Sequence, residues 1–224
     1  IISIYYLYSV MSDLASLVPI LLGGFKTTLA IFGLTLLFSI PLGLLVAVLK
    51  MSRFRIVRYP VSFYISVMRG TPLLLQIVAI YFGSYYLGEY SGLDISFDRF
   101  PAVIAAFSVN YAAYFAEIYR SGIESMPVGQ YEAAKVLGFN KAQTFFKIIL
   151  PQVIKRILPP VTNETITLVK DTSLAFVIAV TEMFTIAKQI SAKEANVMPL
   201  MVAGAFYFVF NYVVAFIMEC IEKK

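Results

Sequence analysis

The chain has 224 residues, of which 60% are hydrophobic and only 14% are charged. A globular protein carries about a quarter charged residues, so a soluble fold of this length would lack the charge to cover its apolar surface, and lipid is its natural surrounding. With no histidine and one cysteine, Cys220, an internal disulfide and a His- or Cys-rich metal site are excluded, and we expect no metal and no cofactor in this chain. The net charge is +5, and the charged residues cluster between hydrophobic runs. This pattern encodes membrane topology, so we expect no nucleic-acid partner.

The N-terminal segment is apolar and holds three closely spaced tyrosines, Tyr5, Tyr6 and Tyr8. Tyrosine collects at the headgroup depth of membranes, so residues 1–18 are predicted to form a short helix lying in the interface. The first full span is predicted at residues 28–49. This stretch has no charged residue before Lys50 and matches the roughly 20 apolar residues that cross a bilayer as a helix.

Four further apolar stretches predict four more spans. The second, residues 59–87, is interrupted by the sequence Arg-Gly-Thr-Pro at 69–72, and the third, residues 100–119, carries Asn110 and Glu117. The fourth, residues 165–187, carries Lys170, Asp171 and Glu182, whereas the fifth, residues 197–218, has no charge.

The loops between these stretches differ in charge. Residues 50–58 hold four basic residues, residues 88–99 hold three acidic residues against one arginine, and residues 120–160 are again rich in lysine and arginine. Because positive loops stay in the cytoplasm, the N-terminus is predicted outside and the C-terminus inside. We therefore expect an all-α membrane protein with five transmembrane helices and a single domain, residues 1–224.

The cytoplasmic segment at residues 126–151 is longer than a connector needs to be. Glu-Ala-Ala at 132–134 favours a helix, Pro127 suits its first turn, and Gly138 suits the left-handed position just past its end. A second short amphipathic helix is predicted at 141–150, ending before Pro151. Two short helices around a glycine would form a compact knob that can receive force from a soluble partner.

This segment resembles the cytoplasmic signature of bacterial ABC importer permeases. That signature reads Glu-Ala-Ala, three residues, Gly, nine residues, Ile, one residue, Leu-Pro, and the chain matches it at 132–134, Gly138, Ile148 and 150–151. Three further stretches, RGTPLLLQ at 69–76, residues 114–134 and LVKDTSL at 168–174, resemble the polar amino-acid branch of the family. The resemblance covers about residues 20–220.

The resemblance implies a type I ABC importer permease, multi-pass in the bacterial inner membrane. Such permeases are dimers, here favoured as a homodimer, and each subunit docks on an ABC ATPase that binds ATP and Mg²⁺, while an extracytoplasmic binding protein delivers the amino acid. The chain itself is expected not to be an enzyme, because its nearest string to a phosphate loop, residues 23–27, lacks a glycine directly before the lysine. The residues implied in ATPase coupling are Gln130, Tyr131, Glu132, Ala133, Ala134, Leu137, Gly138 and Phe139.

Polar residues of the third and fourth spans are the candidates for substrate contact. Asn110, Tyr114, Glu117 and Ser121 recur at steps of four, three and four, which places them on one helix face. We hypothesise that Glu117 and Asp171 provide carboxylates for the amino or cationic end of a substrate, with Thr172 and Ser173 beside Asp171. The alternative is an ion pair of Glu117 with Arg120 or Arg69, and of Asp171 with Lys170. Glu164 and Glu182 are expected at interfacial positions near helix ends.

The break in the second span is the candidate for the other end of the substrate. Pro72 removes one backbone donor and frees the carbonyl of Met68, and broken helices often present such groups to a substrate. Met68, Arg69 and Thr71 would then recognise a carboxylate, unless Pro72 only bends the helix.

These observations predict an importer of polar amino acids, with a lean toward arginine, lysine or histidine because of the acidic residues on the expected path. Two alternatives remain open. One is a permease for another small solute. The other is a channel or membrane enzyme without ATP coupling, which leaves the spacing in 126–151 unexplained.

Overall fold

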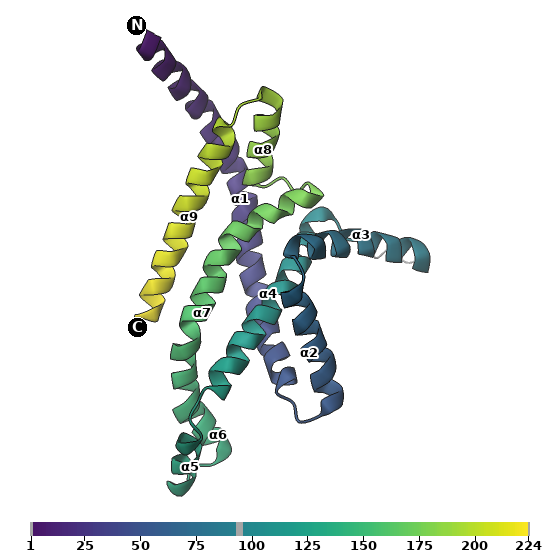
Figure 1. Cartoon of the computed structure of the whole chain (residues 1–224), viewed down its shortest axis with the longest axis vertical. Helices are drawn as coiled ribbons and strands as arrows, with labels where there is room; N and C mark the ends of the chain where they lie inside the picture. The colour runs from purple at the N-terminus through teal and green to yellow at the C-terminus, as the bar shows by residue number, and fades with distance from the viewer. Residues whose placement is uncertain (1, 93–95, 224) are drawn as a thin grey trace. The chain divides into compact units, whose positions relative to one another are not determined.

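A computed structural model describes residues 2–92 and 96–223, and their side chains from residue 15 onward. These residues form helices joined by short turns, and no strand occurs among them (Figure 1). The predicted all-α class is confirmed.

Helix α1 (Ile2–Lys50) is unbroken. The predicted N-terminal segment 1–18 is therefore continuous with the predicted span 28–49 and not a separate helix. The side chains of Tyr5, Tyr6 and Tyr8 lie outside the described residues, so their interfacial position stays a prediction.

The predicted second span is divided into two helices, α2 (Arg55–Gly70) and α3 (Leu73–Ser91). The break falls at Thr71 and Pro72, where the sequence predicted it, because proline cannot donate to the preceding turn. Helix α4 (Arg99–Glu124) follows and contains the predicted third span. Residues 93–95 of the intervening acidic loop lie outside the described part.

The segment after α4 holds two short helical elements. Helix α5 (Val128–Val136) is followed by α6 (Lys141–Gln143), which runs through a π-helical stretch, η1 (Thr144–Ile149), directly into α7 (Leu150–Asp171). The prediction that the second short helix ends before Pro151 is wrong. The amide of Leu150 donates to the carbonyl of Phe145, one residue further back than in an α-helix, so the ladder is already shifted where the proline lacks its donor.

The predicted fourth span is also divided. Helix α7 tightens into a 3-10 helix, η2 (Thr172–Ile178), then the chain turns at Ala179, which has a left-handed φ of 55°, and α8 (Met183–Glu194) begins. Helix α9 (Met198–Glu222) contains the predicted fifth span. Among the described residues, the stretch 15–50, α4 and α9 are each long and apolar enough to cross a membrane, and counting each broken pair as one span raises the number there to five, the predicted number.

The helices group into two compact units that each collect three stretches of chain. The first unit contains Ile1–Leu34, Leu74–Ala105 and Leu168–Val213, and the second contains Thr35–Leu73, Ala106–Thr167 and Val214–Lys224. The core of the first includes Leu21, Met183, Ala187 and Ala203. The second has two clusters, Val46, Ala47, Ile65, Ala113 and Ala116, and Met126, Ile149 and Val153.

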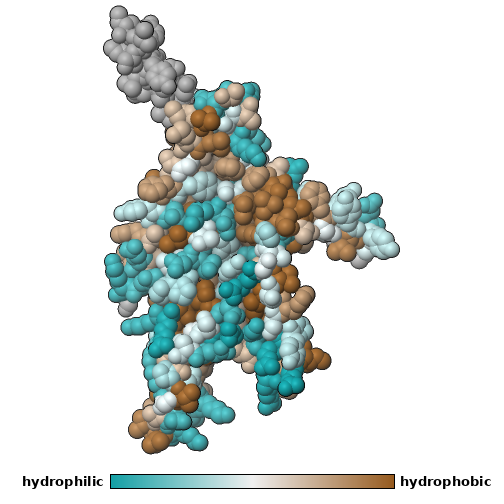
Figure 2. Space-filling model, viewed as in Figure 1, coloured by the Kyte–Doolittle hydropathy of each residue, from teal (hydrophilic) through white to brown (hydrophobic). Residues whose placement is uncertain are grey.

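Large apolar side chains also lie on the surface, as the brown areas of Figure 2 show. Leu37 on α1 is 62% exposed and Phe208 on α9 is 72% exposed. Water would penalise such helices, whereas lipid tails solvate them.

Candidate functional site

The end of α2 and the middle of α4 form a small cavity in the second unit. It has a volume of about 410 Å³ and is lined by Ile65, Ser66, Arg69, Gly70 and Tyr114. The guanidinium carbon of Arg69 lies 5.3 Å from the centre of the Tyr114 ring, within the range of a cation–π contact. The ring thus holds an exposed guanidinium at the cavity, a group that pairs in bidentate fashion with carboxylates.

The carbonyl that Pro72 frees has a partner inside the protein. Asn110 on α4 is buried, and its side-chain amide donates to the carbonyl oxygen of Met68 at 3.0 Å. At the same break the hydroxyl of Thr71 donates to the carbonyl of Val67 at 2.8 Å. One lone pair of the Met68 carbonyl is therefore used by Asn110, and the broken end of α2 is tied to α4 and to its own last turn.

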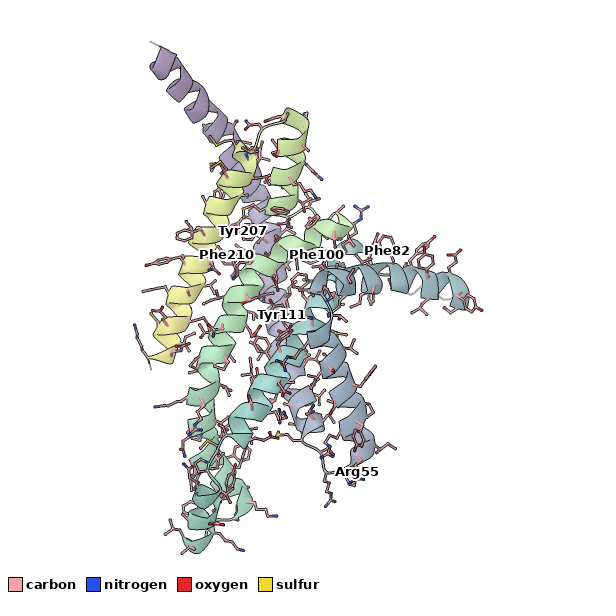
Figure 3. All side chains as sticks on the ribbon, in the orientation of Figure 1. Arg55, Phe82, Phe100, Tyr111, Tyr207 and Phe210 are labelled. Atoms are coloured by element: carbon pink, nitrogen blue, oxygen red, sulfur yellow. The ribbon has the colours of Figure 1, made fainter. Side chains whose placement is uncertain are left out.

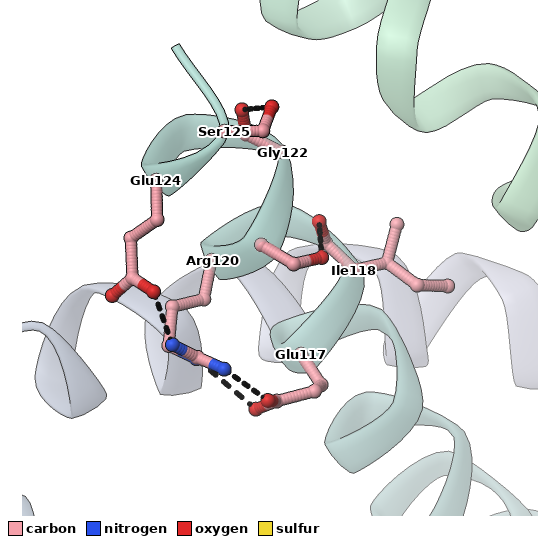
Figure 4. Close-up of polar contacts among 7 residues, drawn as sticks. Glu117, Ile118, Arg120, Gly122, Glu124 and Ser125 are labelled. Carbon is pink, nitrogen blue, oxygen red and sulfur yellow. Dashed lines mark hydrogen bonds and ion pairs between the residues drawn. The ribbon is translucent and has the colours of Figure 1, made fainter. Parts of the chain in front are cut away.

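Glu117 is engaged in an ion pair. Arg120, one turn along α4, donates to the carboxylates of both Glu117 and Glu124 (Figure 4). Of the arrangements considered from the sequence, the pair with Arg120 is the one observed. The side chains of Glu117 and Arg120 are 24% and 26% exposed, so this pair lies at an accessible surface and not in the core.

The predicted polar stripe along α4 changes character from one end to the other. Asn110 is buried, Tyr114 and Glu117 are half-buried, and Ser121 is exposed, its hydroxyl donating to the carbonyl of Ile118 at 3.1 Å. In the middle of the stripe, Tyr114 and Glu117 are accessible and are each held by an arginine, Arg69 and Arg120 respectively.

Asp171, Thr172 and Ser173 lie in the first unit, where α7 tightens into η2. Thr172 is fully buried, and its hydroxyl donates to the carbonyl of Val169 at 2.7 Å. Ser173 is half-buried and donates to the carbonyl of Lys170 at 2.8 Å. Asp171 is half-buried, and its pairing with Glu117 of the second unit in one site stays a prediction.

The glycine turn after α5 has the predicted geometry. Gly138 has a φ of +79°, its amide donates to the carbonyl of Lys135 at 3.1 Å, and the amide of Phe139 donates to the carbonyl of Ala134 at 3.0 Å. This pair of bonds is a Schellman motif, in which glycine avoids the steric penalty of the left-handed region. Asn140 then caps α6 in a reciprocal capping box with Gln143. The turn between the two short helices is thus held by both backbone and side-chain hydrogen bonds.

We call α5, α6 and η1 together the coupling elbow; it sits where α4 ends and α7 begins (Figure 1). Gln130 and Gln152 exchange hydrogen bonds of 2.9 and 2.8 Å, which join α5 to α7. Of the predicted coupling residues, Ala134 is buried, Gln130 and Phe139 are half-buried, and the exposed ones are Tyr131, Glu132, Ala133, Leu137 and Gly138.

Apolar groups remain uncovered on the coupling elbow. Val136 is 87% exposed and Leu137 73% exposed. Beside them is a cavity of about 730 Å³, lined by Tyr131, Lys135, Phe139, Asn140, Lys141, Thr144 and Phe145. A rigidly braced, apolar and lysine-rimmed surface of this kind is suited to a protein partner.

One polar centre, formed around Glu182, was not predicted from the sequence. Glu182 is the N-cap of α8, near a helix end as expected, but it is fully buried inside the first unit. The usual N-cap residues are serine, threonine, aspartate and asparagine, so a glutamate before an apolar helical run gives little signal for a cap. Nor does the local sequence reveal burial, which depends on helices far away in the chain.

The sequence of the chain is similar to those of known transport permeases. The family model described as "Binding-protein-dependent transport system inner membrane component" matches residues 39–224. The chain is 37% identical over 208 residues to the L-cystine transport system permease protein TcyB of Bacillus subtilis, covering 92% of this chain and 86% of the relative. It is 38% identical over 208 residues to the arginine transport system permease protein ArtQ of the same species, covering 92% and 93%. Octopine transport system permease protein OccM of Rhizobium radiobacter is 40% identical over 201 residues, covering 87% and 80%.

Solved structures agree with these relatives. The crystal structure of an amino acid ABC transporter with histidines matches with a TM-score of 0.85 and 32% identity, covering 94% of this chain and 96% of that one. The MetNI methionine ABC transporter in an inward-facing conformation matches with a TM-score of 0.70 at 19% identity, which supports the fold alone. The chain belongs to the family of binding-protein-dependent transport system inner membrane components, the permease subunits of ABC importers.

Proposed function

We propose that this chain is the translocating subunit of an ATP-driven amino-acid importer, with the coupling elbow as its contact to the ATPase. The observation that carries the proposal is the exposed elbow itself: its Glu-Ala-Ala helix, Schellman glycine and apolar surface are braced against α7. Relatives named for cystine, arginine and glutamine transport support the substrate class, because these molecules share an α-amino-carboxylate head.

The proposed mechanism is alternating access. A partner ATPase binds ATP and Mg²⁺, and its closure displaces the elbow. Because η1 runs into α7 without a break, a displacement of the elbow is transmitted along that helix. A second permease subunit, in the simplest case an identical one, completes the path, and an extracytoplasmic binding protein supplies the amino acid.

Within this chain, the proposed substrate groups are Arg69 with Tyr114 for the α-carboxylate, and Asp171 with Ser173 for the amino end. Asn110, Met68 and Thr71 act on the same end of α2 by fixing the break. Glu117 forms an ion pair with Arg120, so its negative charge is already paired. The proposed preference for a basic side chain, as in arginine, lysine or histidine, therefore depends mainly on the carboxylate of Asp171.

The test uses the permease purified with its ATPase and reconstituted in liposomes. A stoichiometric ATPase should co-purify, and uptake should be measured across arginine, lysine, histidine, glutamine and cystine. We expect Arg69→Ala to raise the KM for uptake by about tenfold, since hydrogen bonds to charged groups contribute roughly 1.5–3 kcal/mol.

The matched control is Arg58→Ala. Arg58 lies near the start of the same helix and also contacts an aromatic ring, that of Tyr59, at 5.8 Å, so it should leave the KM unchanged. Equal effects of both variants would contradict a role of Arg69 in binding. Purification without any ATPase, together with passive flux of solutes, would indicate a channel and overturn the proposed function.

A further inference from the structure

Glu182 is a buried carboxylate held by neutral donors. One oxygen accepts hydrogen bonds from the amide of Thr185 at 2.5 Å and from its hydroxyl at 2.7 Å. The other accepts from the amide of Phe184 at 2.7 Å, from the Tyr207 hydroxyl at 3.0 Å and from the Thr28 hydroxyl at 3.5 Å. A buried carboxylate is costly unless such bonds and a helix N-terminus offset its lost hydration.

The donors come from three helices of the first unit, which Glu182 therefore joins. Thr28 lies on α1 and Thr185 on α8. Tyr207, labelled in Figure 3, lies on α9. Helix α1 packs closely against the start of α8 because residue 24 is a glycine. A Cβ at this position would lie only 2.9 Å from the backbone nitrogen and the Cα of Met183. The amide of Met183 in turn donates to the Thr28 hydroxyl at 3.3 Å.

Tyr207 contacts both ends of the segment between α7 and α8. Its hydroxyl donates to Glu182 at the exit of this segment, and the same oxygen lies 3.5 Å from the hydroxyl of Thr172 at its entrance. The first and last residues of the segment 172–182 therefore both lie beside the Tyr207 hydroxyl. A 3-10 stretch between α-helices is a frequent place for a functional hinge, and this segment contains one, η2.

We propose that Glu182 is a positioning residue for the proposed substrate segment 171–173. By holding the Tyr207 hydroxyl, Glu182 keeps that oxygen packed 3.5 Å from the Thr172 hydroxyl, whose own proton goes to the Val169 carbonyl. This packing supports the site where α7 tightens into η2, so that Asp171 and Ser173 on either side keep their orientation. Thr172, being buried, acts in this link and does not touch the substrate. The inference rests on the proposed function only for the role of Asp171 and Ser173; the link itself is a property of the first unit.

Two variants separate capping of α8 from the link to Tyr207. In Glu182→Asp the shorter carboxylate still accepts from the amides of Phe184 and Thr185, since aspartate is a strong N-cap, but it no longer reaches Tyr207. Tyr207→Phe removes the link and keeps the cap. We expect both to speed hydrogen exchange at the amides of 172–178 by at least tenfold, while the amides of Phe184 and Thr185 stay protected.

In transport, both variants should raise the KM by about fivefold and change kcat less than twofold. The double variant should be no worse than either single one, because the two substitutions break the same contact. A residue that only stabilises the fold would lower yield and melting temperature with an unchanged KM, and the double variant would add the two losses.

Matched controls exist on the same helices. Thr35→Val on α1 removes a buried hydroxyl that has no hydrogen-bond partner among the described residues, whereas Thr28→Val removes a fully buried one that bonds to Glu182. Tyr212→Phe on α9 removes an exposed hydroxyl. Unchanged exchange at 172–178 in Glu182→Asp and Tyr207→Phe overturns the link. Altered exchange with an unchanged KM overturns the positioning role, and absence of any amino-acid uptake by the parent protein overturns the proposed function and leaves the exchange result to decide the link.

Discussion

At the scale of single residues, two kinds of buried polar group differ in what their removal should cost. Asn110 and Glu182 have partners on other helices. The hydroxyls of Thr35, Ser39 and Ser108 have none within the part of the chain that the structure describes. Removing a member of a bonded pair leaves the other group buried and unsatisfied, whereas removing a hydroxyl without a partner leaves nothing behind. The two kinds therefore predict different costs for chemically similar substitutions.

The break after α2 provides a test of this difference. Asn110→Leu removes the amide that donates to the Met68 carbonyl and should lower the free energy of unfolding by about 1–3 kcal/mol. Ser108→Ala, two residues earlier on the same helix and also buried, should lower it by clearly less, because no hydrogen-bonded partner of the Ser108 hydroxyl is left unsatisfied among the described residues. Thermal unfolding in detergent measures both, and equal losses would argue against the Asn110–Met68 bond.

At the scale of elements, the coupling elbow is shaped by backbone geometry more than by side chains. Gly129 and Gly138 both have room for a methyl group, since no heavy atom lies within 4 Å of the point that a Cβ would occupy. They differ in the backbone: Gly129 lies inside α5, whereas Gly138 has a positive φ. An alanine at each position thus isolates the cost of the left-handed conformation.

We expect Gly138→Ala to destabilise the elbow by about 1–2 kcal/mol, the penalty of an L-residue in the left-handed region. Gly129→Ala should be neutral or stabilise α5 by up to about 1 kcal/mol. The measurement is the affinity of the permease for its ATPase, by co-purification at graded ATPase concentration, together with thermal unfolding. Similar affinities for the two variants would show that the turn does not shape the contact.

At the scale of the whole molecule, the orientation in the membrane is a prediction that is based on the charge of the loops. Cys220, the chain's one cysteine, is exposed near the C-terminus, and the positive-inside rule places it in the cytoplasm. A membrane-impermeant maleimide should leave Cys220 unlabelled in right-side-out vesicles and label it after the membrane is opened.

The control for this labelling is Tyr90→Cys in a Cys220→Ser background. Tyr90 is 95% exposed near the end of α3, beside the loop predicted to lie outside, so it should react in sealed vesicles. Labelling of Cys220 from the outside would reverse the proposed topology and place the coupling elbow away from any cytoplasmic ATPase.

Much of the fold could be predicted from the sequence because its signals are local. Apolar runs of membrane length, the proline break at 71–72 and the positive φ of Gly138 each depend on a few consecutive residues. The spacing of the elbow signature is local too, and it indicates the family without reference to any tertiary contact. The predicted helix end before Pro151 was wrong because a π-helical stretch shifts the hydrogen-bond ladder ahead of the proline.

Sequence alone therefore determined that the chain is helical, belongs in lipid and carries a coupling elbow. Tertiary structure alone decided which polar groups are available. The Asn110 side chain donates a hydrogen bond to a backbone carbonyl 42 residues earlier in the chain, and Glu182 accepts one from Thr28, 154 residues away. The physical reason is that a polar group's burial and partners are set by whichever helix packs against it. Helical periodicity gives the face on which a residue lies, but it does not identify the neighbour that covers that face.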